Sequence, residues 1–459
     1  MTERFDAIVI GVGQAAPALC ARLDKEGLKT ALIERKLLGG TCVNNGCVPT
    51  KTLVASAHAA HLARRGGDFG FASRAVRVDM AAVKRRKDHV VRQSTDGLKK
   101  WIAGMKHVSL VRGHAKFVGG RRISVQGREL EAERIFINVG ARAAVPDLPG
   151  VKDVPFFTNS SMMSVDFLPR HLLIVGGSYI GLEFAQMYRR FGSQVTVVER
   201  APKLLPREDD DIAAEIRAVL KREEIEIRID AECMELKKKG KHIVIGLHCK
   251  GGKPIAEGTH VLLAVGRTAN TADLGLREAG IDTDERGYIK VDDECRTSVN
   301  GVWALGECNG RGAFTHTSYN DYEIVAANLF DNDPRRISDR IQAYALFIDP
   351  PLGRAGMSEA EARKSGRRIL AGKMPMARVG RAREAGETQG FMKVLVDAES
   401  KELLGAAILG MNGDEIVHSV LDMMYAKRPY TTIQRAVHIH PTVTELIPTL
   451  LGNLKPLSP

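Results

Sequence analysis

Two segments of the chain repeat the same order of apolar run, glycine-rich turn and helical pattern. The first is FDAIVIGVGQAAPALCARLDKEGLKTALIER at residues 5–35, and the second is HLLIVGGSYIGLEFAQMYRRFGSQVTVVER at residues 171–200. Each opens with a short apolar run that predicts a buried strand, continues with apolar residues at helical spacing, and closes with a second apolar run. Strand, turn, helix and strand in this order predict a parallel βαβ unit, so we expect two such units in an α/β fold.

The turn of each unit carries small residues at the spacing of a dinucleotide fingerprint. In such a turn the first glycine permits the bend, the second lets the backbone approach a pyrophosphate, and a small third residue lets the helix pack on the strand. A glutamate follows each first glycine after 23 residues, where it can hold ribose hydroxyls. The predicted cofactor-binding residues are Gly11, Gly13, Ala16 and Glu34 in the first unit, and Gly176, Gly177, Gly181 and Glu199 in the second. In the second unit Ser178 stands where the middle glycine is usual.

Length, composition and charge define the setting of these units. The chain has 459 residues, too many for one hydrophobic core, and its 44% hydrophobic and 27% charged residues are ordinary for packed domains. The net charge of +12 is spread along the chain, and its densest cluster, KRRK at 84–87, lies in a polar pattern that predicts a solvated amphipathic helix. This cluster has no interleaved aromatic residues, so we expect no nucleic-acid partner. We also expect no membrane association, because the apolar runs are too short for a span.

Two cysteines stand close together in GGTCVNNGCVPTK, residues 39–51. The N-terminal MTERFDAIVIGVG is unlike a signal peptide, so we expect a cytoplasmic protein, in which a disulfide is more often catalytic than structural. In a regular helix, residues five apart lie roughly 8–9 Å apart, beyond the ~7 Å that a disulfide tolerates. The chain should therefore bend between Cys42 and Cys47, and the intervening Asn-Asn-Gly permits such a bend. The pair predicts a redox-active disulfide.

A disulfide and a nicotinamide need a carrier between them. Nicotinamide delivers two electrons as a hydride, and a flavin can accept that hydride and pass the electrons to sulfur. We therefore predict FAD in one unit and NAD(P) in the other. Glu199 favours NADH over NADPH because a carboxylate repels the ribose phosphate, whereas the neighbouring Arg200 leaves NADPH possible.

Six motifs are spread over nearly the whole chain, namely GVGQAA, GGTCVNNGCVPTK, GGSYIGLE, AVGRTAN, TSVNGVWALGE and HPTVTE. Together they resemble the class I pyridine nucleotide-disulfide oxidoreductases, a family that includes glutathione reductase, dihydrolipoamide dehydrogenase and mercuric reductase. The cysteine segment and GRGAFTHTSYNDYEIVAANL are most similar to the mercuric-reductase-like branch, which includes reductases connected with resistance to reactive chlorine.

The resemblance implies a role for each of several residues. Cys47 would be the thiolate that lies against the flavin, and Cys42 the interchange thiol that attacks the substrate. Lys51 would approach the flavin and pair with Glu183. Tyr179 would cover the flavin and swing aside for nicotinamide.

The resemblance also implies an active site shared between two subunits. His440, oriented by Glu445, would be the acid/base for the cysteine pair of the other subunit, so a homodimer acting on a small oxidised substrate is expected. Contacts with FAD or NAD(P) are further expected for Gly40, Thr41, Lys51, Gly140, Gly266, Gly306 and Glu307.

Some features depart from the family pattern and leave the substrate open. Glu307 stands where the family usually has an aspartate that binds the flavin ribityl chain. The last cysteine is Cys308, so the C-terminal cysteine pair of familiar mercuric reductases is missing and efficient mercury reduction is not expected. Alternatives are a dihydrolipoamide dehydrogenase and, in another class, a non-catalytic flavin-containing binding or scaffold protein. His58 and His61 lie one helical turn apart without a third ligand, so we predict no metal site.

The order of the motifs predicts an α/β protein with two Rossmann-like domains and a C-terminal α+β dimerisation domain. Residues 1–149 would form the first part of the FAD-binding domain and 150–270 the NAD(P)-binding domain. Residues 271–340 would complete the FAD-binding domain, with VWAL before Gly306 as its closing strand, and 341–459 would form the dimerisation domain.

Overall fold

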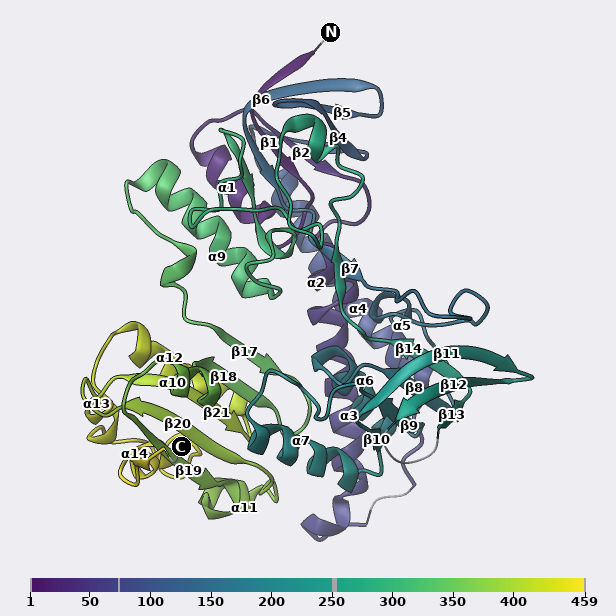
Figure 1. The fold of residues 1–459 in the computed structure, drawn as a ribbon, viewed down its shortest axis with the longest axis vertical. Coiled ribbons are helices and arrows are strands. Elements are labelled where there is room, and N and C mark those ends of the chain that lie inside the picture. The colour runs from purple at the N-terminus through teal and green to yellow at the C-terminus, as the bar shows by residue number, and fades with distance from the viewer. Residues whose placement is uncertain (1, 73–74, 250–253, 458–459) are drawn as a thin grey trace.

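The computed structural model describes residues 2–72, 75–249 and 254–457. The first βαβ unit belongs to a seven-stranded sheet at one end of the molecule (Figure 1). Its strands are β1 (Glu3–Ile10), β2 (Thr30–Glu34), β3 (Val108–Arg112), β4 (Ala115–Gly119), β5 (Arg122–Val125), β6 (Arg128–Ile137) and β16 (Val302–Ala304). Strands β3, β2, β1 and β6 pair in parallel in this order, and the hairpin of β4 and β5 joins the first half of β6 antiparallel. Strand β16 pairs in parallel with the end of β6, as predicted from VWAL.

The central strand of this sheet is buried on both faces. Along β1, Ile8 and Ile10 pack into the core on one face, whereas Ala7 and Val9 pack into the core on the other. Helices α1 (Ala16–Lys25) and α9 (Thr315–Ala326) contribute residues to the second of these cores. Burial on both faces explains why the strand is a nearly continuous apolar run in sequence.

The second βαβ unit forms a four-stranded parallel sheet in the order β10, β9, β8, β14. Its elements are β8 (His171–Val175), α6 (Tyr179–Phe191), β9 (Gln194–Val198), α7 (Asp210–Arg222), β10 (Glu226–Arg228) and β14 (His260–Leu263). A three-stranded antiparallel sheet is inserted before β14, formed by β11 (Ala231–Lys239), β12 (His242–Cys249) and β13 (Ile255–Gly258). The short strands β7 (Ala141–Ala143) and β15 (Arg267–Ala269) pair where the chain leaves and re-enters the first unit.

Long helices connect the two units. Helix α2 (Gly40–Asn45) is followed directly by α3 (Cys47–Arg64), which packs against α6 and against α4 (Met80–Ala103). The predicted helix around KRRK is therefore present as α4, but the expectation that its basic residues are solvated is wrong for Lys87. That side chain is 5% exposed, and its ammonium donates a hydrogen bond to the carbonyl of Met163 over 2.7 Å and pairs with Asp88.

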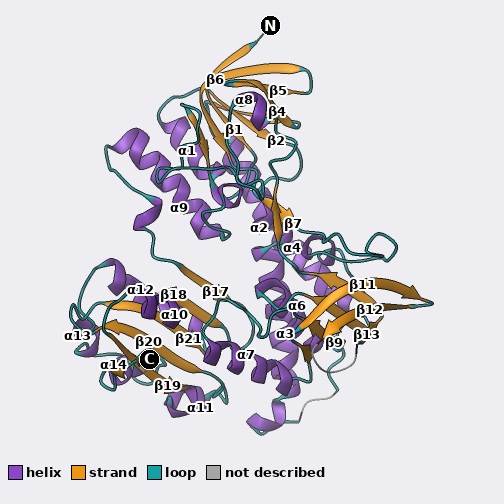
Figure 2. Cartoon of the chain, viewed as in Figure 1, coloured by secondary structure: helices purple, strands orange, loops and turns teal. Residues whose placement is uncertain are grey.

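The C-terminal part is a six-stranded antiparallel sheet with helices packed on it (Figure 2). Its strands follow the order β17 (Ala343–Leu346), β18 (Leu352–Gly356), β21 (Leu403–Leu409), β20 (Phe391–Asp397), β19 (Ile369–Pro375) and β22 (Lys455–Pro456). Helix α12 (Gly413–Tyr425) packs on β18 and β21. The predicted fold class is confirmed, while the limits of the four segments stay a prediction.

The shorter helices are α5 (Asn159–Met162), α8 (Leu276–Ala279), α10 (Glu359–Lys364), α11 (Gly380–Glu384), α13 (Thr431–Gln434) and α14 (Leu446–Leu451). Across the described parts of the chain, we find no helix with the length and apolar character that crossing a membrane requires.

Candidate active site

A large cleft, ≈2020 Å³ in volume, runs from the first glycine turn to the second and is also lined by α12 of the C-terminal part. Its volume is about twice the upper end of the usual range for a small-ligand pocket, roughly 300–1,000 Å³. The cleft therefore has room for more than one ligand, as two dinucleotide sites require.

The turn after β1 has the geometry expected of a nucleotide-binding turn. Gly11 has φ +91°, and a Cβ atom on it would lie 2.6 Å from the Asn138 carbonyl oxygen. A Cβ atom on Gly13 would lie 2.5 Å from Asn138 Oδ1, and Ala16 begins α1 fully buried. Glu34, at the end of β2, accepts hydrogen bonds from the backbone N–H groups of Val12 over 2.8 Å and Lys36 over 2.7 Å. Only small residues fit this turn, and Glu34 ties it to the neighbouring strand.

The turn after β8 repeats this arrangement. Gly176 has φ +114°, and a Cβ atom on Gly181 would lie 2.0 Å from the Gly176 carbonyl oxygen, so the helix packs closely on the turn. Glu199 accepts hydrogen bonds from the N–H groups of Gly177 over 2.7 Å and Ala201 over 2.8 Å. Glu34 and Glu199 thus each accept hydrogen bonds from two backbone N–H groups, one 22 residues before the glutamate and one two residues after it. The duplication seen in sequence extends to the hydrogen bonds.

Asn138, which follows β6, is a cleft residue that the sequence did not single out. Its Nδ2 donates to the Leu305 carbonyl over 2.8 Å, which orients the amide so that Oδ1 faces the first glycine turn. Oδ1 is buried and has no hydrogen-bond partner among the described residues. Gly306 has φ +75°, and a Cβ atom there would lie 3.0 Å from Asn138 Nδ2. Asn138 therefore joins the first glycine turn to the turn after β16, and a polar residue ending the run RIFIN was its only signal in sequence.

The other predicted glycines of the cleft are required for different reasons, either a backbone conformation that favours glycine or a lack of space for a side chain. Gly140 and Gly266 have φ +63° and +132° with open space around them, so only the backbone conformation favours glycine there. Gly40 has φ +59°, and a Cβ atom on it would lie 3.1 Å from the Cα atom of Gly13. The cysteine segment, which includes the half-buried Thr41, therefore lies directly against the first nucleotide turn.

The predicted bend between the cysteines is confirmed. Helix α2 ends at Asn45, Gly46 breaks the helix with φ −128° and ψ −118°, and α3 begins at Cys47. Cys42 and Cys47 are both free thiols in this structure. The break at Gly46 removes the regular helical separation that would have kept the two sulfurs apart.

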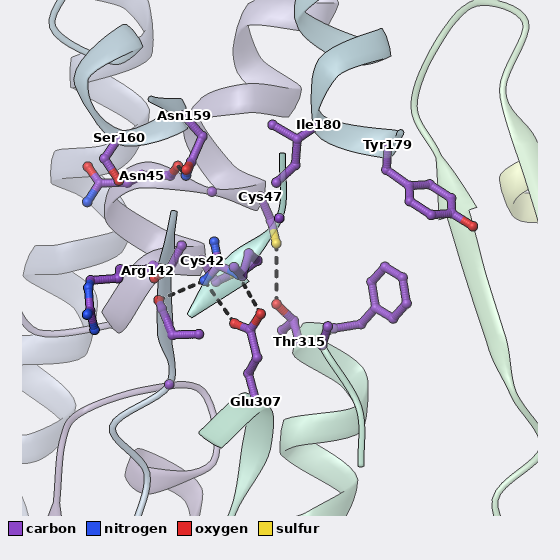
Figure 3. A pocket seen from close by; sticks show the side chains of 18 of the residues that line it. Cys42, Asn45, Cys47, Arg142, Asn159, Ser160, Tyr179, Ile180, Glu307 and Thr315 are labelled. Carbon is purple, nitrogen blue, oxygen red and sulfur yellow. Dashed lines mark hydrogen bonds and ion pairs between the residues drawn. The ribbon is translucent and has the colours of Figure 1, made fainter. Parts of the chain in front are cut away.

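The two thiols differ in acidity. The pKa of Cys47 is lowered to about 6, first by a hydrogen bond from Cys42 and further by Thr315 and by the charge of Lys51, against the effect of burial. The pKa of Cys42 is raised by the same hydrogen bond to Cys47 and by burial. The Thr315 hydroxyl, at the start of α9, lies 3.3 Å from Cys47 Sγ (Figure 3). Near neutral pH the pair is therefore a Cys47 thiolate beside a Cys42 thiol, and Thr315 is a contributor that the sequence did not reveal.

The predicted pairing of Lys51 with Glu183 is present. Lys51 lies one turn after Cys47 on α3, and its ammonium is 2.9 and 2.8 Å from the two carboxylate oxygens of Glu183 on α6. The same ammonium stands 4.3 Å from the ring centroid of Phe347, whose backbone N–H also donates to Glu183 over 3.1 Å. A cation is thereby fixed beside the thiolate.

Tyr179 and Glu307 line the cleft, each with a partner that sequence reasoning did not foresee. The Tyr179 hydroxyl donates to Glu208 Oε1 over 3.0 Å, and Figure 3 shows its ring pointing away from Cys47. The Glu307 carboxylate forms an ion pair with Arg267 through both oxygens, one of them 2.8 Å from Nη2. Both side chains contact groups from other parts of the chain, and their predicted roles toward the cofactors stay predictions.

His440 and Glu445 form the predicted pair, but away from the cysteines of the same chain. His440 Nδ1 lies 3.1 and 3.0 Å from the two oxygens of Glu445, and the His440 side chain is 80% exposed. Val437 and Ile439 beside it are 100% and 80% exposed. Neither His440 nor Glu445 lines the cleft formed by the described residues.

Two other clusters are explained without a ligand. His58 pairs with Asp349 over 2.7 Å, and Asp349 also binds Arg190, so this histidine belongs to an ion-pair network. Three carboxylates lie close enough to hold a cation, but the ammonium of Lys393 reaches each of them over 2.7–2.8 Å. These carboxylates are Asp209, Asp211 and Glu359.

Comparison with known proteins assigns the family. Residues 5–321 match the family model of pyridine nucleotide-disulphide oxidoreductases, and residues 342–451 match the dimerisation domain of these enzymes. The chain belongs to this family, which confirms the predicted resemblance. It is therefore an enzyme of the FAD- and pyridine-nucleotide-dependent disulfide oxidoreductase class, with the dimerisation domain of that class.

Several relatives match over nearly the whole chain. A probable pyridine nucleotide-disulfide oxidoreductase of Escherichia coli K12, RclA, is 35% identical over 461 residues, covering 99% of this chain and 100% of RclA. A dihydrolipoyl dehydrogenase of Cupriavidus necator is 31% identical and covers 97% of both chains. A mercuric reductase of Staphylococcus aureus is 29% identical over 90% of this chain and 76% of its own length. The solved structure of RclA, described as a HOCl-induced flavoprotein disulfide reductase, has a TM-score of 0.89 at 34% identity, covering 97% of this chain and 99% of that one.

Proposed function

We propose that this enzyme passes electrons from NADH through FAD to a Cys42–Cys47 disulfide, and from there to a small oxidised substrate. The observation that carries the proposal is the unequal thiol pair inside the nucleotide cleft, in which a hydrogen bond from Cys42, and further Thr315 and Lys51, lower the pKa of Cys47. When bound, FAD takes a hydride from nicotinamide and delivers two electrons to sulfur.

The residues around the disulfide suit this chemistry. Opening the S–S bond takes up two electrons and one proton and yields a Cys47 thiolate and a Cys42 thiol, which is the order of their acidities. Lys51 would hold positive charge beside the flavin and the thiolate, and Glu183 would keep Lys51 charged and in place. Once deprotonated, Cys42 would attack the substrate.

The fit of the chain to FAD is supported by the first glycine turn. Gly11, Gly13 and Gly40 leave no space for side chains where a pyrophosphate would approach the backbone. Asn138 Oδ1, which has no hydrogen-bond partner among the described residues, would accept a hydrogen bond from one hydroxyl of the dinucleotide. Residues 1–149 and 271–340 would hold FAD, and 150–270 would hold the nicotinamide nucleotide.

We assign NADH as the preferred nucleotide because Glu199 places a carboxylate at the ribose end of the second unit. Arg200 and Arg207 also line the cleft, so NADPH should be used less well but not excluded. The ratio of kcat/KM for the two nucleotides tests this assignment, and Glu199→Ala should shift the ratio toward NADPH.

The acceptor that we propose is a reactive oxidant or a metal ion. RclA of Escherichia coli is described as HOCl-induced and has been solved as a Cu(II) complex, and mercuric reductases are also similar to this chain. The dihydrolipoyl dehydrogenase relatives favour a second candidate, oxidation of dihydrolipoamide. NADH oxidation with Cu(II) and NAD reduction with dihydrolipoamide separate the two.

A homodimer in the cytoplasm completes the proposal. His440 is exposed beside Val437 and Ile439, so a second chain, joined through residues 341–459, could bring it to the cysteines. His440 would then exchange protons with Cys42, while Glu445 orients the ring. A mixture of Cys42→Ser and His440→Ala chains should regain one intact site per mixed dimer, whereas each variant alone should turn over far more slowly than the wild type.

The proposal as a whole is tested with Cys42→Ser. This variant should retain FAD and should still be reduced by NADH, but it should lose turnover with the acceptor. Retained turnover would show that the acceptor does not receive its electrons through this thiol.

A further inference from the structure

Glu208 is a fully buried carboxylate just before α7, and it directly follows Arg207, which lines the cleft. Two phenols donate to the same oxygen, Oε1: Tyr179 over 3.0 Å and Tyr344 of β17 over 2.6 Å. The other oxygen has no hydrogen-bond partner among the described residues, and its nearest cation is Arg354 Nε at 4.0 Å. The side-chain hydrogen bonds to this buried carboxylate therefore come from the two phenols.

Tyr179 lies where its ring can affect nucleotide binding. It is the first residue of α6, directly after the second glycine turn, and Ile180 next to it also lines the cleft. Its ring packs edge-on against Tyr344 at 5.5 Å and Phe314 at 6.3 Å between centroids. The hydrogen bond to Glu208 accompanies a ring that points away from Cys47 (Figure 3).

We propose that Glu208 is a positioning residue. Its hydrogen bond holds the Tyr179 ring away from the place where nicotinamide would bind, so that the nicotinamide site is open in a fraction of the enzyme molecules before the nucleotide binds. The inference rests on the proposed function and on the role that the family resemblance implies for Tyr179, which would cover the flavin when no nucleotide is bound. The hydroxyl of Tyr344 also donates to Glu208 Oε1. This oxygen therefore keeps one hydrogen bond when the Tyr179 ring leaves it to cover the flavin.

The arrangement also connects the nucleotide site to the C-terminal part. Tyr344 and Arg354 belong to β17 and β18, whereas Glu208 and Tyr179 belong to the second βαβ unit. A shift of the C-terminal sheet would thus change the number of hydrogen-bond donors to Glu208. It would thereby change how strongly Glu208 binds the Tyr179 hydroxyl. A hydrogen bond to a charged group changes an equilibrium by about tenfold or more, and apparent nucleotide affinity scales with the open fraction.

The test is anaerobic stopped-flow reduction of the FAD-loaded enzyme over a range of NADH concentrations. Tyr179→Phe keeps the ring but removes the donor, so the apparent Kd for NADH should rise about tenfold. Glu208→Gln should act in the same direction. If Glu208→Gln fails to fold, Tyr179→Phe is sufficient for the test.

Tyr344→Phe is the matched control, because it removes the other phenol from the same oxygen. Glu208 would then rely on Tyr179 alone, so the apparent Kd for NADH should fall or stay the same. A purely structural role would weaken NADH binding in both Tyr→Phe variants, and that result would overturn the proposal, as would an unchanged Kd in Tyr179→Phe. Failure of the proposed function differs from both, because the wild-type flavin would then not be reduced by NADH.

Discussion

Thr315→Val is the variant that tests most closely how the structure makes Cys47 acidic. The Thr315 hydroxyl lies 3.3 Å from Cys47 Sγ and donates to it in the thiolate form. Hydrogen bonds to charged groups contribute about 1.5–3 kcal/mol, and about 1.4 kcal/mol corresponds to one pKa unit. Cys47 is open to solvent although neighbouring groups partly desolvate its thiolate, so solvent screens the interaction and the lower end of this range applies. The pKa of Cys47 should rise by about one unit from about 6.

The sign of the pH dependence follows from the lowered pKa. Above its pKa Cys47 is a thiolate, so the long-wavelength absorbance of a thiolate beside the flavin should be full near neutral pH. It should be lost as the pH falls through about 6. In Thr315→Val the same loss should be centred near pH 7, about one unit higher.

The assay is a pH titration of that absorbance in the two-electron-reduced enzyme. Thr52→Val is the matched control, because Thr52 lies on the same helix as Cys47 and its hydroxyl donates to the Val48 carbonyl instead. An unchanged midpoint in Thr315→Val, or an equal shift in the control, would refute the reasoning.

Three further variants address the cation, the flavin turn and the histidine. Lys51→Met should raise the midpoint of the same titration, because the Lys51 charge also lowers the pKa of Cys47; a midpoint at the wild-type value would contradict this. Asn138→Leu should weaken FAD binding about tenfold, measured by flavin fluorescence on the apoprotein, because it breaks the link between the first glycine turn and Leu305. An unchanged FAD affinity would show that this link is not needed. His440→Ala should lower turnover by roughly 10²–10⁴-fold, the usual contribution of general acid–base catalysis, and leave flavin reduction by NADH unchanged in stopped-flow. Turnover near the wild-type level would remove His440 from the mechanism.

The parts of the fold that sequence predicted are those with a local cause. The two βαβ units follow from apolar periodicity and glycine spacing, and the break at Gly46 follows from the distance that a disulfide tolerates. The pairing of Lys51 with Glu183 joins residues 132 positions apart and was predicted only through the family resemblance.

The residues that sequence missed act through long-range contacts or against the local pattern. Thr315 reaches Cys47 across 268 positions and Asn138 reaches Leu305 across 167, and no periodicity in the chain indicates either contact. Lys87 was misjudged because a basic run in a polar helix usually faces water, whereas the Met163 carbonyl and Asp88 bind its ammonium in the interior.

The central claim, that the cysteine pair receives electrons from the flavin, is tested most directly by anaerobic titration of the purified enzyme with NADH. The account predicts that about one equivalent produces a long-wavelength band from the Cys47 thiolate and the flavin, and that Cys47→Ser abolishes the band. Bleaching of the flavin without such a band in the wild-type enzyme would contradict it and would place both cysteines outside the electron path.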